Sequence, residues 1–297
     1  MEASPDYEAM RRDVGAFELP RDFLRVAGPD AVPWMQGQLS QDVAALPVGA
    51  AADSLLLQPQ GKVDALLRVL RLGPEELVLD VDEGFGEAAL ARLRRFKIRV
   101  KADVDPLGWH CLALRGPRAP DVAPFATGGV LVAADWPGLP GVDVVGEAPA
   151  LSEPAVRRCS LDTWQTLRIE AGIPAMGAEL TERTIPAEAG IVARTVSFTK
   201  GCYTGQELVA RIDSRGGNVP RHLRGIVVDG ATPPVGAAVM VGDKEVGTLT
   251  SVAPAPGGAG VVALAYVRRE VEPPAEAEVR WEDAAAAARV EILPLVH

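Results

Sequence analysis

The chain has 297 residues, of which 48% are hydrophobic and 24% are charged, so it can form about two domains around a sizeable core. The formal net charge is −10, and a uniformly acidic surface repels a phosphate backbone, which argues against direct, stable nucleic-acid binding. The N-terminus lacks the basic start and apolar run of a signal peptide, and no stretch approaches about 18 consecutive apolar residues. We therefore expect a cytoplasmic protein that does not engage a membrane.

The three cysteines, Cys111, Cys159 and Cys202, are far apart in the sequence and odd in number. This pattern argues against a disulfide framework and for a reducing compartment. The sequence contains no CxxC or HExxH motif and only three histidines, so one chain cannot assemble a structural zinc site or a four-cysteine cluster. We expect no metal site.

Strand-like and helix-like runs alternate in the first half of the chain, which predicts an α+β unit with antiparallel pairing. The expected strands cover residues 17–28, 52–60, 63–72, 76–81, 97–104 and 109–116. The expected helices cover residues 28–43, with Asp30 as N-cap, 84–96, and 153–172, closed by Gly172.

After Arg221 the sequence changes to short apolar runs separated by Gly/Pro turns, which predicts a small β-barrel or sandwich. We place a domain boundary near residue 220. Residues 1–220 are expected to form two interleaved α+β subdomains, one of them at about 50–150, and residues 221–297 a C-terminal β-barrel domain.

The most unusual segment is SFTKGCYTGQELVARI, residues 197–212, in which Lys200 precedes Cys202 by two residues. Thr204 and Glu207 have the spacing of a capping box, which would place Cys202 just before a helix N-terminus. A helix terminus and a nearby lysine both favour the thiolate, so we expect a lowered pKa for a reactive Cys202. The alternative is a structural turn in which a small buried cysteine packs and Lys200 is solvated.

The motif KGCYTGQE resembles the signature of the YgfZ family, bacterial relatives of the glycine-cleavage T-protein with a mitochondrial counterpart in iron–sulfur cluster assembly. Further similar segments are GPDAVPWMQGQLSQDV, QPQGKVDALLRVL, RIEAGIPAMGAEL and VARIDSRGGNVPRHLRGI. The resemblance implies a cloverleaf of three subdomains around a central folate channel, with the β-barrel as the last subdomain. The residues that it implies as support for Cys202 and Lys200 are Gly201, Tyr203, Gly205, Gln206, Glu207 and Arg211.

The resemblance also implies tetrahydrofolate, or a derivative of it, as the cofactor. In T-protein relatives a glutamate in an R-x-E-A-G turn binds the pterin ring, and Glu170 matches it within RIEAG. A carboxylate can accept two parallel hydrogen bonds from pterin N–H groups. Trp164 matches a tryptophan implicated in folate binding. An ordinary helix-end acid and a core aromatic side chain are the alternative interpretations of these two residues.

Aminomethyltransferases of this kind place a catalytic aspartate in the strand after the QGK turn. One alignment puts Leu66 at that position and another brings Asp64 near it. If Leu66 takes the position, no carboxylate of that strand is left to stabilise positive charge at the folate nitrogen, and aminomethyl transfer is disfavoured.

Three functions follow from the resemblance. The first is a folate-binding accessory protein for iron–sulfur cluster assembly or repair, which supports tRNA-modifying and other cluster enzymes indirectly, with iron–sulfur proteins or assembly factors as partners of Cys202. The second is a folate-dependent aminomethyl or one-carbon transferase in which Asp64 acts. The third is a folate sensor or scaffold without catalysis.

Overall fold

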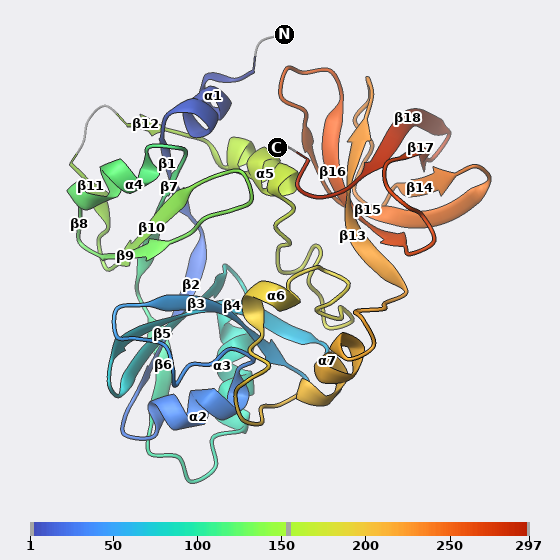
Figure 1. Ribbon diagram of the computed structural model, residues 1–297. Coiled ribbons are helices and arrows are strands. Elements are labelled where there is room, and N and C mark those ends of the chain that lie inside the picture. The colour runs from blue at the N-terminus through green and yellow to red at the C-terminus, as the bar shows by residue number, and fades with distance from the viewer. Residues whose placement is uncertain (1–2, 153–155, 296–297) are drawn as a thin grey trace.

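The computed structural model describes residues 3–152 and 156–295, which form three lobes (Figure 1). Two lobes each contain a five-stranded sheet, in the orders β12-β1-β7-β10-β9 and β3-β4-β5-β2-β6, and the third is a closed barrel of strands β13-β16-β15-β14-β17-β18. A short pair, β11-β8, lies beside the first sheet. The expected mixture of helices and strands with a C-terminal barrel is confirmed.

The strands of the two sheets and the short pair are β1 Gly15–Leu19, β2 Arg21–Ala27, β3 Ala51–Leu57, β4 Val63–Gly73, β5 Glu76–Asp82, β6 Asp103–Leu107, β7 His110–Arg115, β8 Ala126–Thr127, β9 Val130–Ala133, β10 Gly141–Gly146, β11 Ala150–Leu151 and β12 Arg157–Arg158. The barrel strands are β13 Arg221–Val228, β14 Ala238–Val241, β15 Lys244–Pro254, β16 Val261–Arg268, β17 Ala275–Trp281 and β18 Ala284–Glu291. The helices are α1 Pro5–Arg12, α2 Ala31–Gln38, α3 Gly86–Arg95, α4 Ala119–Val122, η1 Ala123–Phe125, α5 Leu161–Ala171, α6 Val192–Thr195 and α7 Gln206–Asp213. No helix in these described ranges is long and apolar enough to span a membrane.

The predicted strand 17–28 is two strands that belong to different sheets. Pro20 separates β1 from β2, because proline has no N–H for a ladder and interrupts the pairing. The chain therefore leaves the first sheet at Pro20, builds the whole second sheet, and returns to the first at β7. These exchange points lie near residues 20 and 108, in place of the expected 50 and 150.

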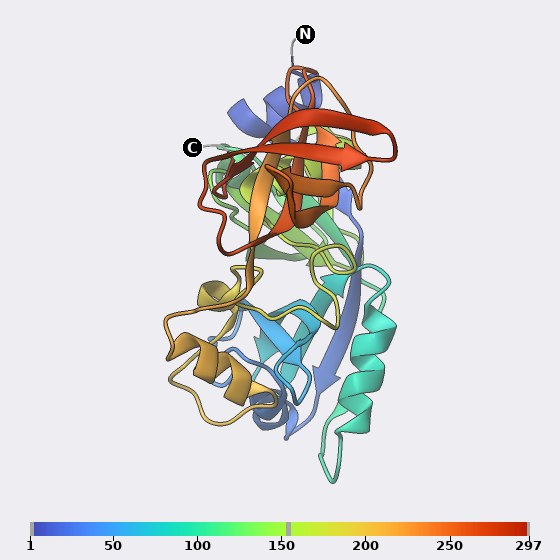
Figure 2. The same cartoon turned by 90° about the vertical axis from the view of Figure 1, so that its right-hand side faces the viewer.

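The second sheet packs its apolar face into the largest core of the molecule. Met35 of α2, Leu93 of α3 and Leu79 of β5 belong to this core, and all three are almost completely buried. Figure 2 shows α3 and α7 on opposite sides of this lobe. The predicted strand 97–104 is wrong over most of its length: Arg99 has a positive φ of 58°, and β6 begins only at Asp103.

The helix predicted at 153–172 is shorter in the structure. Residues 153–155 lie outside the described ranges, Arg157–Arg158 form β12, and α5 starts after Ser160, whose side chain accepts from the Thr163 N–H. The helix ends at Gly172 with φ 71°, the left-handed geometry that favours glycine, as predicted.

A buried polar network connects the barrel to the end of α5. Arg168 Nη1 lies 3.0 Å from Glu179 Oε2, and the two side chains are 1% and 0% exposed. Arg168 Nη2 donates to Ser251 Oγ at 2.7 Å, and the same hydroxyl donates to Glu179 Oε1 at 2.6 Å. Because Ser251 belongs to β15, this network fixes the barrel against α5 and the 173–190 connection that begins at its end.

We predict that Glu179→Ala destabilises the protein by about 3–5 kcal/mol, because it leaves the Arg168 charge buried without its partner. The melting temperature should fall by roughly 5–15 °C, measured by thermal unfolding. Glu182→Ala, on an exposed side chain of the same connection, is the matched control and should change it little. Equal melting temperatures for the two variants would contradict this account of the interface.

Candidate functional site

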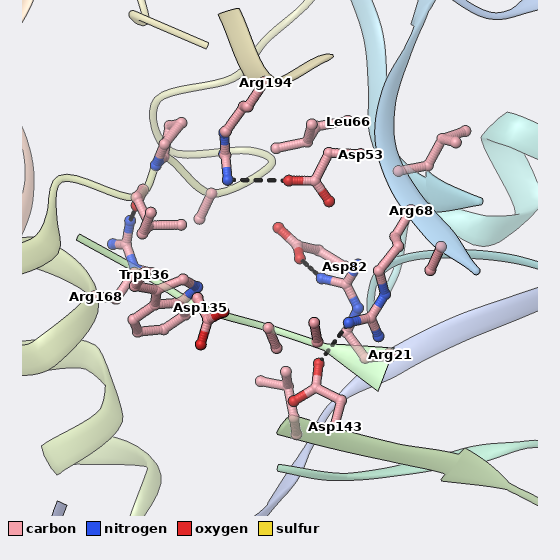
Figure 3. Close-up of a pocket in the computed structure, with 18 of the residues that line it drawn as sticks. Arg21, Asp53, Leu66, Arg68, Asp82, Asp135, Trp136, Asp143, Arg168 and Arg194 are labelled. Atoms are coloured by element: carbon pink, nitrogen blue, oxygen red, sulfur yellow. Dashed lines mark hydrogen bonds and ion pairs between the residues drawn. The ribbon is translucent and has the colours of Figure 1, made fainter. Parts of the chain in front are cut away.

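A cavity of about 230 Å³ lies between the two sheets and the end of α5. Its lining is mostly charged and aromatic side chains, many of which are drawn in Figure 3. The charged residues of the lining are Arg21, Asp53, Arg68, Asp82, Arg115, Asp135, Asp143, Arg168 and Arg194. Trp136, Trp164 and Leu66 also line it.

Asp143 connects the two sheets across the wall of this cavity. It accepts from Arg115 Nη1 at 2.7 Å and from Arg68 Nη1 at 2.8 Å, and Arg68 also binds Asp80. Burial alone would raise the pKa of Asp143, but the guanidinium groups of Arg115 and Arg68 outweigh it and lower the pKa to about 2. The carboxylate is therefore charged at neutral pH. The arginine and aspartate side chains of the cavity wall offset one another's charge.

One end of the cavity is aromatic. The rings of Trp136 and Trp164 lie 5.8 Å apart, centroid to centroid, and tilted at 54°. The guanidinium of Arg115 lies 5.0 Å from the Trp136 ring centroid, a cation–π distance. Such an arrangement favours a flat, polar ring as ligand.

Leu66, Asp53 and Arg194 also line the cavity, and Arg194 Nη1 lies 3.1 Å from Asp53 Oδ2 (Figure 3). Asp64, the alternative carboxylate of β4, is not in the lining, because it pairs with Arg92 of α3 at 3.0 Å. Strand β4 thus lines the site with Leu66, Leu67 and Arg68 but with no carboxylate, and β3 supplies Asp53 beside Leu66.

Glu170 lies on the other side of α5, outside the cavity lining, and is 3% exposed. Both of its carboxylate oxygens accept from the Tyr7 hydroxyl, at 3.1 and 3.0 Å, and one also pairs with Arg11. Burial, and then the Glu170 charge, raise the pKa of Tyr7 to about 12, so Tyr7 keeps its proton. Helix α1 therefore covers Glu170 and takes part of its hydrogen-bonding capacity.

The Cys202 turn differs from the sequence prediction at the helix start. The N-cap of α7 is Gly205, with φ 83° and no side-chain cap, and Cys202 lies four residues before the first helical residue. Thr204 therefore forms no capping box. A Cβ at position 205 would lie 2.4 Å from the Gln58 carbonyl oxygen, so only glycine allows the turn to approach the QGK turn this closely.

Lys200 points into the protein. Its ammonium donates to the carbonyl oxygens of Gln36 and Leu39, both at 2.6 Å, and of Gln41 at 2.9 Å. Burial lowers the pKa of Lys200 to about 8. These bonds attach the Cys202 turn to the end of α2, which is a positioning task distinct from the expected charge beside the thiol.

Some of the remaining motif residues contact the rest of the protein, and the others are exposed to solvent. Tyr203 is buried and its N–H donates to Gln206 Oε1 at 3.2 Å, which closes the turn. Gly201, Cys202, Glu207 and Arg211 are exposed. Among the residues that the structure describes, no group of three or more His, Cys, Asp and Glu is placed to hold a metal ion.

Comparisons with known proteins agree with this geometry. The GCVT N-terminal domain matches residues 2–133, and the glycine cleavage T-protein C-terminal barrel domain matches residues 221–296. An aminomethyltransferase of Thermus thermophilus is 29% identical over 317 residues, covering 95% of this chain and 87% of that protein. A tRNA-modifying protein YgfZ of Edwardsiella ictaluri is 32% identical over 220 residues, covering 66% of this chain and 65% of that protein. The chain belongs to the YgfZ-type, T-protein-like family.

A solved structure shows the same fold. The glycine cleavage system aminomethyltransferase T from Bartonella henselae superimposes with a TM-score of 0.84 at 22% identity, over 99% of this chain and 91% of that one. The T-protein-like fold is thereby confirmed, and the family models and relatives confirm the expected family resemblance.

The charged lining of this YgfZ-type chain was missed by sequence reasoning. Its signal is a charge in the middle of an apolar strand: Arg68 in LLRVL, Asp80 in LVLDV and Asp143 in GVDVV. A buried charge needs a charged partner, so three such positions in one chain predict that they meet.

We predict that a thiol reagent modifies Cys202 much faster than Cys159 or Cys111 in the folded protein at neutral pH. Cys202 is exposed, whereas burial raises the pKa of Cys111 well above its usual value. Burial, and then Asp6, raise the pKa of Cys159 to about 11, which leaves roughly one thiolate in a thousand or fewer. Iodoacetamide labelling with mass spectrometry measures the three rates, and equal rates would remove the basis for a selective thiol.

Proposed function

We propose that this protein is a cytoplasmic, folate-binding accessory factor for iron–sulfur cluster assembly or repair, and that Cys202 is its reactive residue. The observation that carries the proposal is the placement of an exposed thiol on a turn that backbone and lysine contacts hold rigidly, outside the cavity. Support for tRNA-modifying and other cluster enzymes is then indirect, through iron–sulfur proteins or assembly factors as partners.

The cavity fits the ring end of tetrahydrofolate or a derivative. Its volume of about 230 Å³ is just below the roughly 300–1,000 Å³ of pockets that enclose drug-sized ligands, so it can take part of such a molecule. The paired rings of Trp136 and Trp164 suit a flat heteroaromatic ring, and the Trp164 indole N–H is buried without a partner. Aminomethyltransferases are among the relatives of this chain.

Glu170 can bind the pterin only if its present hydrogen-bond partners move. Tyr7 and Arg11 already take part of its four lone-pair sites, and at 3% exposure and outside the cavity lining it presents no free face to a pterin. For Glu170 to anchor the pterin, Tyr7 must turn away. Trp164 needs no such change to contact a ligand.

The role of the protein in the thiol step is to present Cys202. Lys200 fixes the turn by its three carbonyl contacts, and Tyr203 and Gln206 close it, so the sulfur stays toward solvent. From there it can meet a cluster, a persulfide or a thiol on another protein. Each of these three reactions requires a solvent-accessible sulfur, and Cys202 is the exposed cysteine of this chain.

A one-carbon transferase is the second candidate, and one observation favours it. Asp53 lines the cavity beside Leu66, so a carboxylate is available there even though β4 supplies none and Asp64 is engaged with Arg92. Turnover of a reduced folate with an aminomethyl donor, abolished by Asp53→Asn, would select this function. If the protein binds folate but neither Asp53→Asn nor Cys202→Ala changes turnover or complementation, the remaining function is that of a folate sensor or scaffold.

We predict that Cys202→Ala fails to complement a bacterial strain that lacks its own YgfZ-type protein, while folate affinity and melting temperature stay near wild type. Surface substitutions usually change stability by no more than about 0.5 kcal/mol. Cys159→Ala is the matched control and should complement. Cluster-dependent enzyme activity in cell extracts, calorimetry and thermal unfolding supply the three readouts. Full complementation by Cys202→Ala would contradict the proposed role of the thiol.

A further inference from the structure

Three buried donors of the cavity lining have no acceptor. They are Arg115 Nε, Trp164 Nε1 and Arg194 Nη2, and all three atoms are inaccessible to solvent. In the ranges that the structure describes, no buried side-chain acceptor of the lining lacks a partner. Buried polar groups without partners are uncommon in folded proteins, so three donors in one cavity indicate a ligand that brings acceptors.

The three donors lie at two different ends of the cavity. Trp164 lies at the aromatic end, where its ring is close to Trp136, and Arg115 lies over Trp136. Arg194 belongs to α6, and its partner Asp53 belongs to β3 of the second sheet. A flat ring at the tryptophans therefore leaves Arg194 for another part of the same ligand.

Arg194 is held in place before any ligand arrives. Its Nη1 lies 3.1 Å from Asp53 Oδ2, and the Gln41 side-chain amide donates to the carbonyl oxygens of both residues, at 3.4 and 3.5 Å. One nitrogen of the fork is thus occupied and the other, Nη2, is free. A guanidinium fixed in this way can donate to an oxygen at low entropic cost.

We propose that Arg194 is a ligand-binding residue whose Nη2 donates to a carbonyl or carboxylate oxygen of the bound folate, with Asp53 as the residue that positions it. The inference rests on the proposed folate binding. Outside the pterin ring, which is placed at the tryptophans, such an oxygen has two sources in a reduced folate: a formyl group on the one-carbon nitrogen, or the benzoyl-glutamate tail. Methyl and unsubstituted forms lack the first source, and pteroate forms lack the two glutamate carboxylates of the second but keep a carboxylate on the benzoyl ring.

The experiment is calorimetric titration of the full chain with tetrahydrofolate, 5-methyl-tetrahydrofolate, 5-formyl-tetrahydrofolate and 5-formyl-tetrahydropteroate. Wild type is compared with Arg194→Ala and Arg194→Gln, and with Arg183→Ala as control. Arg183 is an exposed arginine of the nearby connection that does not line the cavity. Circular dichroism melting checks that each variant folds, and the glutamine variant serves if the alanine variant does not.

We expect both Arg194 variants to weaken binding of 5-formyl-tetrahydrofolate by about tenfold to a hundredfold, and Arg183→Ala to change nothing, since a lost charge-assisted hydrogen bond has this effect. If the formyl oxygen is the acceptor, wild type prefers the formyl over the methyl form and the variants lose that preference. If a glutamate carboxylate is the acceptor, removing glutamate weakens binding to wild type but not to the variants. Wild-type affinity of both variants for all four probes overturns the inference while folate binding stands. A wild type that binds none of them overturns the proposed function as well.

Discussion

The carboxylate of Asp143 connects the two sheets of this molecule and fixes their relative position. It stands on β10 of the first sheet and binds Arg115 of the same sheet and Arg68 of the second. Removing charges from water costs several kcal/mol per ion, and only close, hydrogen-bonded partners offset it. Each of the three ions therefore depends on the others, and the position of one sheet determines that of the other.

The cavity is a consequence of this constraint. Where apolar side chains would close the space between two sheets, paired ions keep a polar wall, and tryptophans from the first lobe and α5 form one end. The 173–190 connection passes the same region and is itself fixed by the Arg168–Glu179 pair under the barrel. The barrel therefore supports the site indirectly, because Ser251 of β15 binds both members of that pair.

The Cys202 turn stands apart from that site but shares a neighbour with it. The segment after α2 contacts Arg194 and Asp53 through the Gln41 side chain, and receives Lys200 on the Gln41 carbonyl oxygen. Ligand chemistry and thiol chemistry are therefore supported by one segment without sharing a reactive residue. The proposed accessory role needs this separation, since it assigns folate and the partner protein to different surfaces.

Much of the fold was predictable where local chemistry decides the structure. Gly172 ends α5 because a left-handed residue is needed there, and the Gly/Pro turns after Arg221 predict the barrel strands. The prediction was wrong where distant contacts decide. The predicted Thr204 capping box does not form, because Gly205 packs closely against the Gln58 carbonyl oxygen. Lys200 binds three carbonyl oxygens that lie 159–164 residues away in the sequence. For the same reason the sequence predicted a ligand-facing Trp164, which lies in the cavity lining, but not the ion pairs that shape the cavity.

The central claim is that a reduced folate binds with its ring against Trp136 and Trp164, and tryptophan fluorescence tests it most directly. Titration of wild type with 5-formyl-tetrahydrofolate should quench the emission in a saturable way. The double variant Trp136→Phe, Trp164→Phe should lose most of that quench, whereas Trp109→Phe, whose ring packs on Phe23 outside the lining, should keep it. The same saturable quench in the double variant as in wild type would contradict the account, because the ring would then bind elsewhere.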